Sequence, residues 1–170
     1  MQSNKISAMI LAAGFGKRLE NITQNVPKPL VKISGKTLIQ SSLELLNYLN
    51  INDIIINIHY KHSMIRKFIK KNHKKNIKFS YEEQLFDTAG GVKKAFPLFK
   101  YRNVLVLNSD IFWKKNNYLD VKKLIINYKI EEKCKLLLVP KRLSHGIYKK
   151  KGDFFLNKKK IFRYKNKKNI

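Results

Sequence analysis

Apolar residues along this chain gather in short runs, separated by polar stretches rich in lysine, asparagine and glycine. Runs of branched apolar side chains, and one alternating stretch, predict strands over residues 6–13, 53–58, 77–81 and 103–107. Between them, apolar residues recur at helical spacing over 38–49 and 63–71, and Thr37 is a suitable cap for the first helix. This alternation predicts the α/β class: a Rossmann-like, doubly wound, mostly parallel sheet with helices on both faces.

The pattern is less regular beyond residue 108. It predicts an amphipathic helix over 119–130, a buried strand over 136–140, and a small hairpin formed by 153–156 and 160–164. Cys134 enters an apolar run, so we expect a small buried side chain there rather than a nucleophile. The chain shows no internal repeat and no linker, so residues 1–170 are expected to form one domain with a real core.

The first predicted strand ends in a turn with two glycines separated by one residue, Gly14 and Gly16. Glycine lets the backbone turn sharply and approach a ligand without a Cβ in the way. Lys17 and Arg18 follow at once, and bare backbone amides beside positive charge suit a polyphosphate. Taken alone, the two glycines are explained equally well by an ordinary strand-to-helix turn. The dinucleotide-binding fingerprint does not fit, because Leu19 occupies the position of its third glycine.

Two charged residues near the predicted strands are further candidates for a ligand site. Lys28 stands between Pro27 and Pro29, which predict an extended segment and limit the range of the lysine. Asp110 follows the strand predicted over 103–107, at the sheet edge that also carries the glycine turn. A carboxylate at this edge suits Mg²⁺, which prefers oxygen ligands and shares itself with substrate phosphates. The alternative is that Asp110 is a helix cap or a turn residue.

A glycine-rich stretch over residues 89–91 opens another predicted helix, which Asp87 or Thr88 can cap. Its first turn has almost no side chains, and this weakens a helix unless something must pack against it. We interpret the stretch as a flat surface for a base and its ribose. The alternative is a capping turn with no ligand.

The motif L-A-A-G-x-G-x-R-L at 11–19, followed by P-K-P-L at 27–30, resembles the signature of the sugar-1-phosphate nucleotidyltransferases. Other motifs make the chain similar to the small bacterial N-acetylmuramate-1-phosphate uridylyltransferases of peptidoglycan recycling, often labelled mannose-1-phosphate guanylyltransferases. These motifs are E-E-x-x-F-D-T-A-G-G at 82–91, N-x-D-I-F-W at 108–113 and K-G-D-F at 151–154. The resemblance runs from about residue 6 to residue 161 and implies the nucleotide-diphospho-sugar transferase fold. Two positions depart from the family pattern. Lys17 stands where serine or threonine is usual, and Ser109 stands where glycine is usual.

The resemblance implies that a sugar-1-phosphate oxygen attacks the α-phosphorus of UTP or GTP, releasing pyrophosphate and forming a nucleotide sugar. It implies that Arg18, helped by Lys17, neutralises the leaving pyrophosphate. It also implies that Lys28 bridges the α-phosphate and the incoming sugar phosphate. It further implies that Asp110 binds Mg²⁺ as cofactor, that Gly152 with Asp153 lines the sugar side, and that Gln84 and Gly90 face the base. The full set implied in nucleotide binding is Leu11, Ala12, Ala13, Gly14, Gly16, Lys17, Gln84, Ala89, Gly90 and Asn108.

Lysine and arginine outnumber acidic residues so far that the formal net charge is +26. The lysines are scattered over every predicted element rather than gathered in one stripe, so we expect no specific nucleic-acid partner. The charge should still attract anionic substrates. No apolar run is long enough to span a bilayer, and a single cysteine fits a reducing cytoplasm.

Members of the resembled family continue into an acceptor-binding region that carries a second acidic metal ligand. We therefore expect these 170 residues to lack that part and to have low activity by themselves. The alternative function is a truncated, catalytically weak nucleotide-binding remnant or a basic polyanion-binding protein. The sequence leaves the base, the sugar and the oligomeric state open.

Overall fold

The computed structural model describes residues 5–16, 20–73, 76–129, 131–132, 134–143, 153–157 and 160–163. The chain divides into two compact units, Met1–Ile126 and Asn127–Ile170. The expectation of one domain over residues 1–170 stays a prediction.

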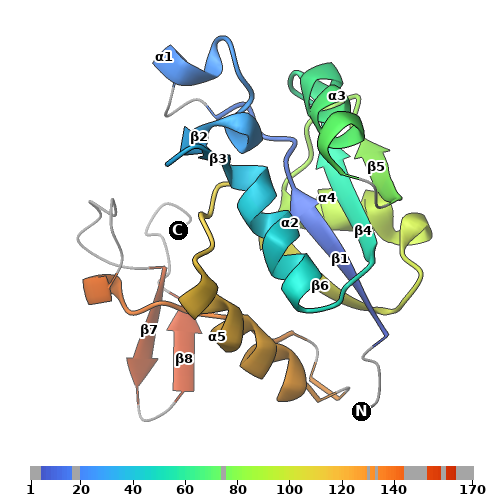
Figure 1. Cartoon of the computed structure of the whole chain (residues 1–170). Coiled ribbons are helices and arrows are strands. Elements are labelled where there is room, and N and C mark those ends of the chain that lie inside the picture. Colours follow the sequence, from blue (N-terminus) through green and yellow to red (C-terminus); the bar gives the residue numbers. More distant parts are fainter. Residues whose placement is uncertain are drawn as a thin grey trace, which may run out of the picture. The chain divides into compact units, whose positions relative to one another are not determined.

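A four-stranded parallel sheet with the strand order β5-β4-β1-β6 forms the centre of the first unit (Figure 1). Strand β1 lies inside the sheet, where Ala8 pairs with Ile54 of β4 on one side and with Leu105 of β6 on the other. The predicted parallel sheet is confirmed, although β1 ends two residues earlier than expected. The four strands are β1 (Ile6–Leu11), β4 (Asp53–Ile58), β5 (Ile77–Tyr81) and β6 (Asn103–Asn108).

Helices cover both faces of this sheet, as the sequence predicts. Successive side chains of a strand point to opposite faces. Ala8 and Ile10 of β1 therefore join one apolar cluster with α2, α3 and α5, whereas Met9 packs on the other face against Ala95 of α4. All three strand residues are fully buried. The helices are α2 (Leu38–Tyr48), α3 (His62–Asn72), α4 (Thr88–Ala95) and α5 (Lys115–Ile126).

Local hydrogen bonds fix where the helices begin. The Thr37 hydroxyl accepts from the Gln40 amide at 3.2 Å, and the Gln40 side chain accepts from the Thr37 amide at 2.9 Å, which makes a capping box. Helix α5 begins after a turn in which the Lys114 amide donates to the Asn117 side chain, so it covers 115–126 rather than 119–130. The shorter elements are α1 (Glu20–Thr23), η2 (Lys28–Leu30), β2 (Lys32–Ile33), β3 (Lys36–Thr37) and η3 (Phe96–Leu98).

Asp53 ties three segments together at the amino edge of the sheet. Its carboxylate accepts from the Ser7 hydroxyl at 2.5 Å, the Lys78 ammonium at 2.7 Å and the Lys100 amide at 2.8 Å. Burial opposes ionisation of this group, but the hydrogen bonds from Lys78, Ser7 and Lys100 outweigh it and hold the pKa of Asp53 below its ordinary value. The ionised carboxylate therefore stabilises the folded chain.

The second unit contains η4 (Lys141–Leu143) and an antiparallel hairpin of β7 (Phe154–Asn157) and β8 (Lys160–Arg163), which confirms the predicted hairpin. Two other predictions are wrong. Leu136–Val139 forms no strand and is exposed, because a strand needs a neighbour and none of the described residues pairs with it. Cys134, at the start of the same run, is exposed too. Among the described residues, no helix is both long and apolar enough to cross a membrane.

Candidate functional site

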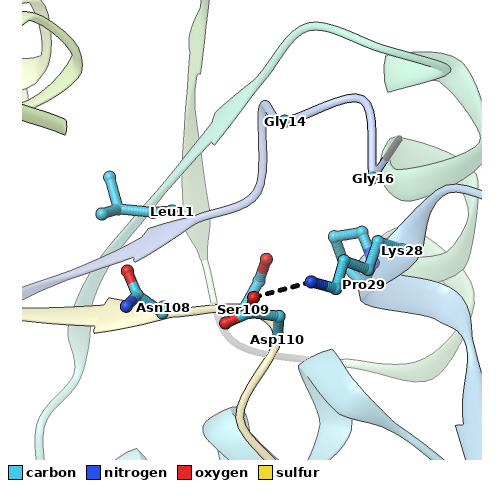
Figure 2. A pocket seen from close by; sticks show the side chains of 8 residues that line it. All are labelled: Leu11, Gly14, Gly16, Lys28, Pro29, Asn108, Ser109 and Asp110. Atoms are coloured by element: carbon cyan, nitrogen blue, oxygen red, sulfur yellow. Dashed lines mark hydrogen bonds and ion pairs between the residues drawn. The ribbon is translucent and has the colours of Figure 1, made fainter. Parts of the chain in front are cut away.

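A pocket of about 340 Å³ opens at the carboxyl edge of the sheet, where β1 and β6 end (Figure 2). The segment that carries Lys28 and Pro29 lines the side of the pocket opposite these strand ends. The lining residues are Leu11, Gly14, Gly16, Lys28, Pro29, Asn108, Ser109 and Asp110. Six residues of the predicted site thus lie around one cavity, although they come from three segments far apart in sequence.

The two glycines of the turn differ in what the fold demands. Gly16 has φ +72°, and a Cβ there would lie 2.9 Å from the Thr23 methyl group, so the turn itself requires glycine. A Cβ on Gly14 would meet no atom within 4 Å, and the φ angle of Gly14 does not lie in the left-handed region. Gly14 is therefore not needed for folding, and its bare backbone leaves space in the pocket.

Lys28 and Asp110 face each other across the pocket. The Lys28 ammonium lies 2.7 Å from Asp110 Oδ2, and their side chains are 21% and 37% exposed (Figure 2). Lys28 opens η2, so the extended segment predicted for it is wrong: Pro27 is extended, but the Leu30 amide bonds the Pro27 carbonyl and closes a 3₁₀ turn. Buried Pro29 anchors this turn.

Asp110 is held at the pocket by the end of β6. The amide of buried Ser109 donates to the Leu11 carbonyl at 3.2 Å, which extends the pairing of β1 and β6 by one residue. Helix α5 begins only at Lys115, so the alternative in which Asp110 caps a helix is wrong. Among the described residues, no group of three or more histidine, cysteine, aspartate or glutamate side chains is arranged to hold a metal.

The predicted base platform lies at the start of α4 and does not line this pocket. Asp87 rather than Thr88 caps the helix, accepting from the Gly90 amide at 2.8 Å. A Cβ on Gly90 would lie 3.0 Å from the Phe86 Cβ, so part of the glycine pattern is explained by tight packing in the capping turn. Gln84 and Ala89 are exposed, and their contact with a base stays a prediction.

Sequence reasoning assigned no role to two buried polar residues beside the pocket, Asn57 and Glu82. The Asn57 side chain accepts from the Ala12 amide at 2.7 Å and donates to Glu82 at 2.8 Å. Asn57 is the penultimate residue of β4 and Glu82 directly follows β5, and a polar residue at the carboxyl end of an apolar strand was the available signal. His59, which follows the end of β4, has its Nδ1 2.8 Å from the Glu82 carbonyl oxygen.

The remaining predicted residues stand apart from the pocket or outside the described part of the chain. Ala12 and Ala13 are buried in the turn that leaves β1, below the pocket surface. Lys17, Arg18 and Gly152 lie outside the described residues. Asp153 belongs to the second unit, where it is exposed just before β7.

The sequence matches the family described as nucleotidyl transferase over residues 7–159, which is most of the chain. The chain belongs to this family. The family resemblance seen in the glycine turn and the Pro-Lys-Pro segment is thereby confirmed.

Two relatives match nearly the whole chain. The D-glycero-alpha-D-manno-heptose 1-phosphate guanylyltransferase of Aneurinibacillus thermoaerophilus is 28% identical over 163 residues, which is 95% of this chain and 68% of that protein. The N-acetylmuramate alpha-1-phosphate uridylyltransferase of Caulobacter vibrioides is 29% identical over 170 residues, 97% of this chain and 70% of that protein.

Solved structures confirm the fold. CTP:phosphocholine cytidylyltransferase of Streptococcus pneumoniae has a TM-score of 0.57 and 29% identity, covering 65% of this chain and 47% of that one. HddC of Yersinia pseudotuberculosis, complexed with GMP-PN, has a TM-score of 0.55 and 26% identity, covering 69% of this chain and 54% of that one. The match thus spans about half the length of each solved structure.

Proposed function

We propose that this chain provides the nucleotide site of an enzyme that transfers a nucleoside monophosphate from a nucleoside triphosphate to a sugar 1-phosphate. The observation that carries the proposal is the meeting of bare backbone, cation and carboxylate in one pocket, at Gly14, Lys28 and Asp110. Ligands of open α/β sheets bind at this carboxyl edge. A generic polyanion binder needs positive charge alone, so this arrangement favours the transferase over that alternative.

In the proposed reaction, an ionised oxygen of the sugar 1-phosphate attacks the α-phosphorus. The bond from this phosphorus to the bridging oxygen breaks, and pyrophosphate leaves with the electron pair. The attacking oxygen already carries charge, so no general base is needed. The barrier comes from bringing two polyanions together and from charge on the leaving group. The Lys28 ammonium is assigned to the α-phosphate and the incoming phosphate, and Arg18 with Lys17 to the pyrophosphate.

Asp110 is assigned to a divalent cation, which we propose is Mg²⁺. The donor set fits this ion, because Mg²⁺ keeps several waters and often takes only one or two carboxylates beside substrate phosphates. The Asp110 carboxylate is partly exposed in the pocket, so it is accessible to an ion that arrives with a nucleotide. When bound, the cation would neutralise charge on the phosphates.

The base and the acceptor are inferred from the relatives and from the predicted platform. We assign Gln84, Ala89 and Gly90 to the base, and Gly152 with Asp153 to the sugar. The names of similar proteins favour UTP or GTP as donor and N-acetylmuramate, heptose or hexose 1-phosphate as acceptor. Such a reaction belongs to nucleotide-sugar synthesis, and with N-acetylmuramate to peptidoglycan recycling in the cytoplasm.

The test is an assay of pyrophosphate release and of nucleotide binding across the four nucleoside triphosphates, with several sugar 1-phosphates and with Mg²⁺ or chelator. We expect a preference for one base and a requirement for the metal. Binding that is indifferent to the base, independent of the metal and abolished by moderate salt would contradict the proposal, since it describes generic attraction to a +26 protein.

A further inference from the structure

A buried chain of hydrogen bonds joins the start of the glycine turn to the segment before α4. The Ala12 amide donates to Asn57 Oδ1 at 2.7 Å, and Asn57 Nδ2 donates to Glu82 Oε1 at 2.8 Å. The Phe86 amide then donates to Glu82 Oε2 at 3.1 Å. We propose that Asn57 and Glu82 are positioning residues, which set the predicted base-side segment, residues 83–90, at a fixed distance from the phosphate pocket. This inference rests on the proposed function.

The orientation of each side chain follows from its partners. Asn57 must present its oxygen to the Ala12 amide and its amino group to the Glu82 carboxylate. In the reverse orientation the amino group would face another donor, the Ala12 amide, and the oxygen would face another acceptor, the carboxylate. Glu82 uses one oxygen for Asn57 and the other for Phe86. Each hydrogen bond in this series therefore has one possible donor and one possible acceptor.

The burial of Glu82 is hard to explain by stability alone. Its side chain is fully buried, and no described lysine, arginine or histidine forms an ion pair with it. Removing a carboxylate from water without an opposite charge is costly, and two hydrogen bonds offset only part of that cost. An apolar side chain at this position would leave the Asn57 amino group and the Phe86 amide without their acceptor, so the carboxylate is what holds these two groups in place. The placement of a carboxylate here is explained if the position of the joined segments matters.

The first turn of α4 is packed directly onto this pair. A Cβ on Gly91 would lie 2.8 Å from Glu82 Oε1 and 3.1 Å from Asn57 Nδ2, so only glycine fits without a shift. The side-chain hydrogen bonds and this contact together connect the glycine turn, the end of β4 and the start of α4. A displacement at Glu82 would therefore move the base-side segment relative to the pocket that Lys28 lines.

In the proposed reaction the base and the α-phosphate belong to one ligand, and its bound conformation sets the distance between them. The two parts of its site must then keep a fixed separation, and an error of about 1 Å is enough to cost on the order of a hundredfold in rate. Because the Asn57–Glu82 pair spans the two parts, it is suited to set both affinity for the nucleotide and preference for one base.

The experiment exchanges the two side chains. In Glu82→Gln, the new amide has one oxygen for two donors, so its amino group meets either Asn57 Nδ2 or the Phe86 amide. In Asn57→Asp, two carboxylates meet. The double variant N57D/E82Q restores every bond, because the amide at 82 donates to the carboxylate at 57 and still accepts from the Phe86 amide. Glu44→Gln makes the same chemical change on an exposed side chain of α2, outside the pocket and the base-side segment, and is the matched control.

The measurements are KM and kcat for each nucleoside triphosphate, with the melting temperature recorded alongside. We expect each single variant to raise KM for the preferred nucleotide by on the order of tenfold or more and to weaken the base preference. The double variant should recover both values, and Glu44→Gln should keep them. A residue that only supports the fold would change the melting temperature without altering the base preference of the folded fraction.

The outcomes separate the two proposals. If the wild-type chain binds no nucleoside triphosphate and releases no pyrophosphate, the proposed function fails. If the wild type is active but the folded single variants keep their KM and base preference, the positioning role alone is overturned. If the single variants do not fold, the double variant decides: wild-type affinity and base preference support the role, and a folded protein that has lost them overturns it.

Discussion

The Lys28 ammonium and the Asp110 carboxylate form an ion pair at 2.7 Å across the pocket, although they lie 82 positions apart in sequence (Figure 2). The proposed function assigns the cation to phosphates and the carboxylate to a metal. Without ligand, each side chain thus neutralises the other. We expect a metal-bound nucleotide to replace both contacts at once, because the lysine exchanges a carboxylate for a phosphate and the aspartate exchanges a lysine for the metal.

Replacing Lys28 with alanine should reduce turnover far more than stability. A partly exposed ion pair contributes about 0–1 kcal/mol to folding. Loss of one charge contact to a transferring phosphoryl group raises the barrier by about 3 kcal/mol, or about a hundredfold in rate. Steady-state kinetics and thermal melting measure the two effects. Lys36→Ala is the matched control, because it removes an exposed ion pair with Glu44 outside the pocket. Full activity of Lys28→Ala would remove the lysine from the site.

Asp110→Asn should abolish metal-dependent nucleotide binding with little change in melting temperature. The amide keeps the size of the side chain but loses the charge that a divalent cation needs. Titration calorimetry with nucleotide, in Mg²⁺ and then in chelator, measures the effect. Asp120→Asn makes the same change on an exposed residue of α5 and should bind like the wild type. An Asp110→Asn protein that melts early and still binds Mg-nucleotide would identify a structural residue instead.

Ionised Asp53 should stabilise the fold at neutral pH and lose this effect in acid, and its replacement should leave nucleotide affinity unchanged. Its pKa lies below the ordinary value of 3.8, so the stability it contributes is fully present above pH 3.8. That stability is lost as pH falls through the lower pKa of the folded state. In chemical denaturation at several pH values, Asp53→Asn should be less stable than the wild type at neutral pH, with the difference shrinking in acid. A constant difference across this range would show that ionisation of Asp53 does not contribute. Nucleotide affinity should be unchanged, since Asp53 lies at the opposite edge of the sheet.

Where an element depends on neighbouring residues alone, the sequence was sufficient to predict it. Strand β4 was expected at its observed bounds from a run of isoleucines, and the Thr37 cap from a hydroxyl before an apolar helix. The glycine turn and Asp110 were placed at one edge because parallel strands bring their carboxyl ends together.

Other features depend on partners that the local pattern does not specify. Leu136–Val139 has the composition of a buried strand, but burial requires a neighbouring strand and none of the described residues provides it. The Asn57–Glu82 pair joins residues 25 positions apart, so neither residue alone indicates it. Lys28 was expected in an extended segment from its two prolines, whereas a backbone hydrogen bond from Leu30 makes a 3₁₀ turn.

The two glycines of the turn should respond in opposite ways to the same substitution. Gly16→Ala places a Cβ at φ +72° and 2.9 Å from Thr23, so it should destabilise the fold by about 1–3 kcal/mol. Gly14→Ala meets no atom and should melt like the wild type or slightly higher. Its methyl group enters the pocket, however, where the proposed phosphates approach the backbone.

Gly14→Ala should therefore weaken nucleotide binding by on the order of tenfold, about 1.4 kcal/mol. Thermal melting and nucleotide titration of the two variants, side by side, separate the structural glycine from the ligand-facing one. Gly35→Ala is a useful third variant, because Gly35 has φ +81° in the β2–β3 turn, outside the pocket. It should lose stability like Gly16→Ala and keep the nucleotide affinity of its folded fraction. If Gly14→Ala binds nucleotide as well as the wild type does, the ligand does not approach the backbone at residue 14, and the phosphate site must be sought elsewhere in the pocket.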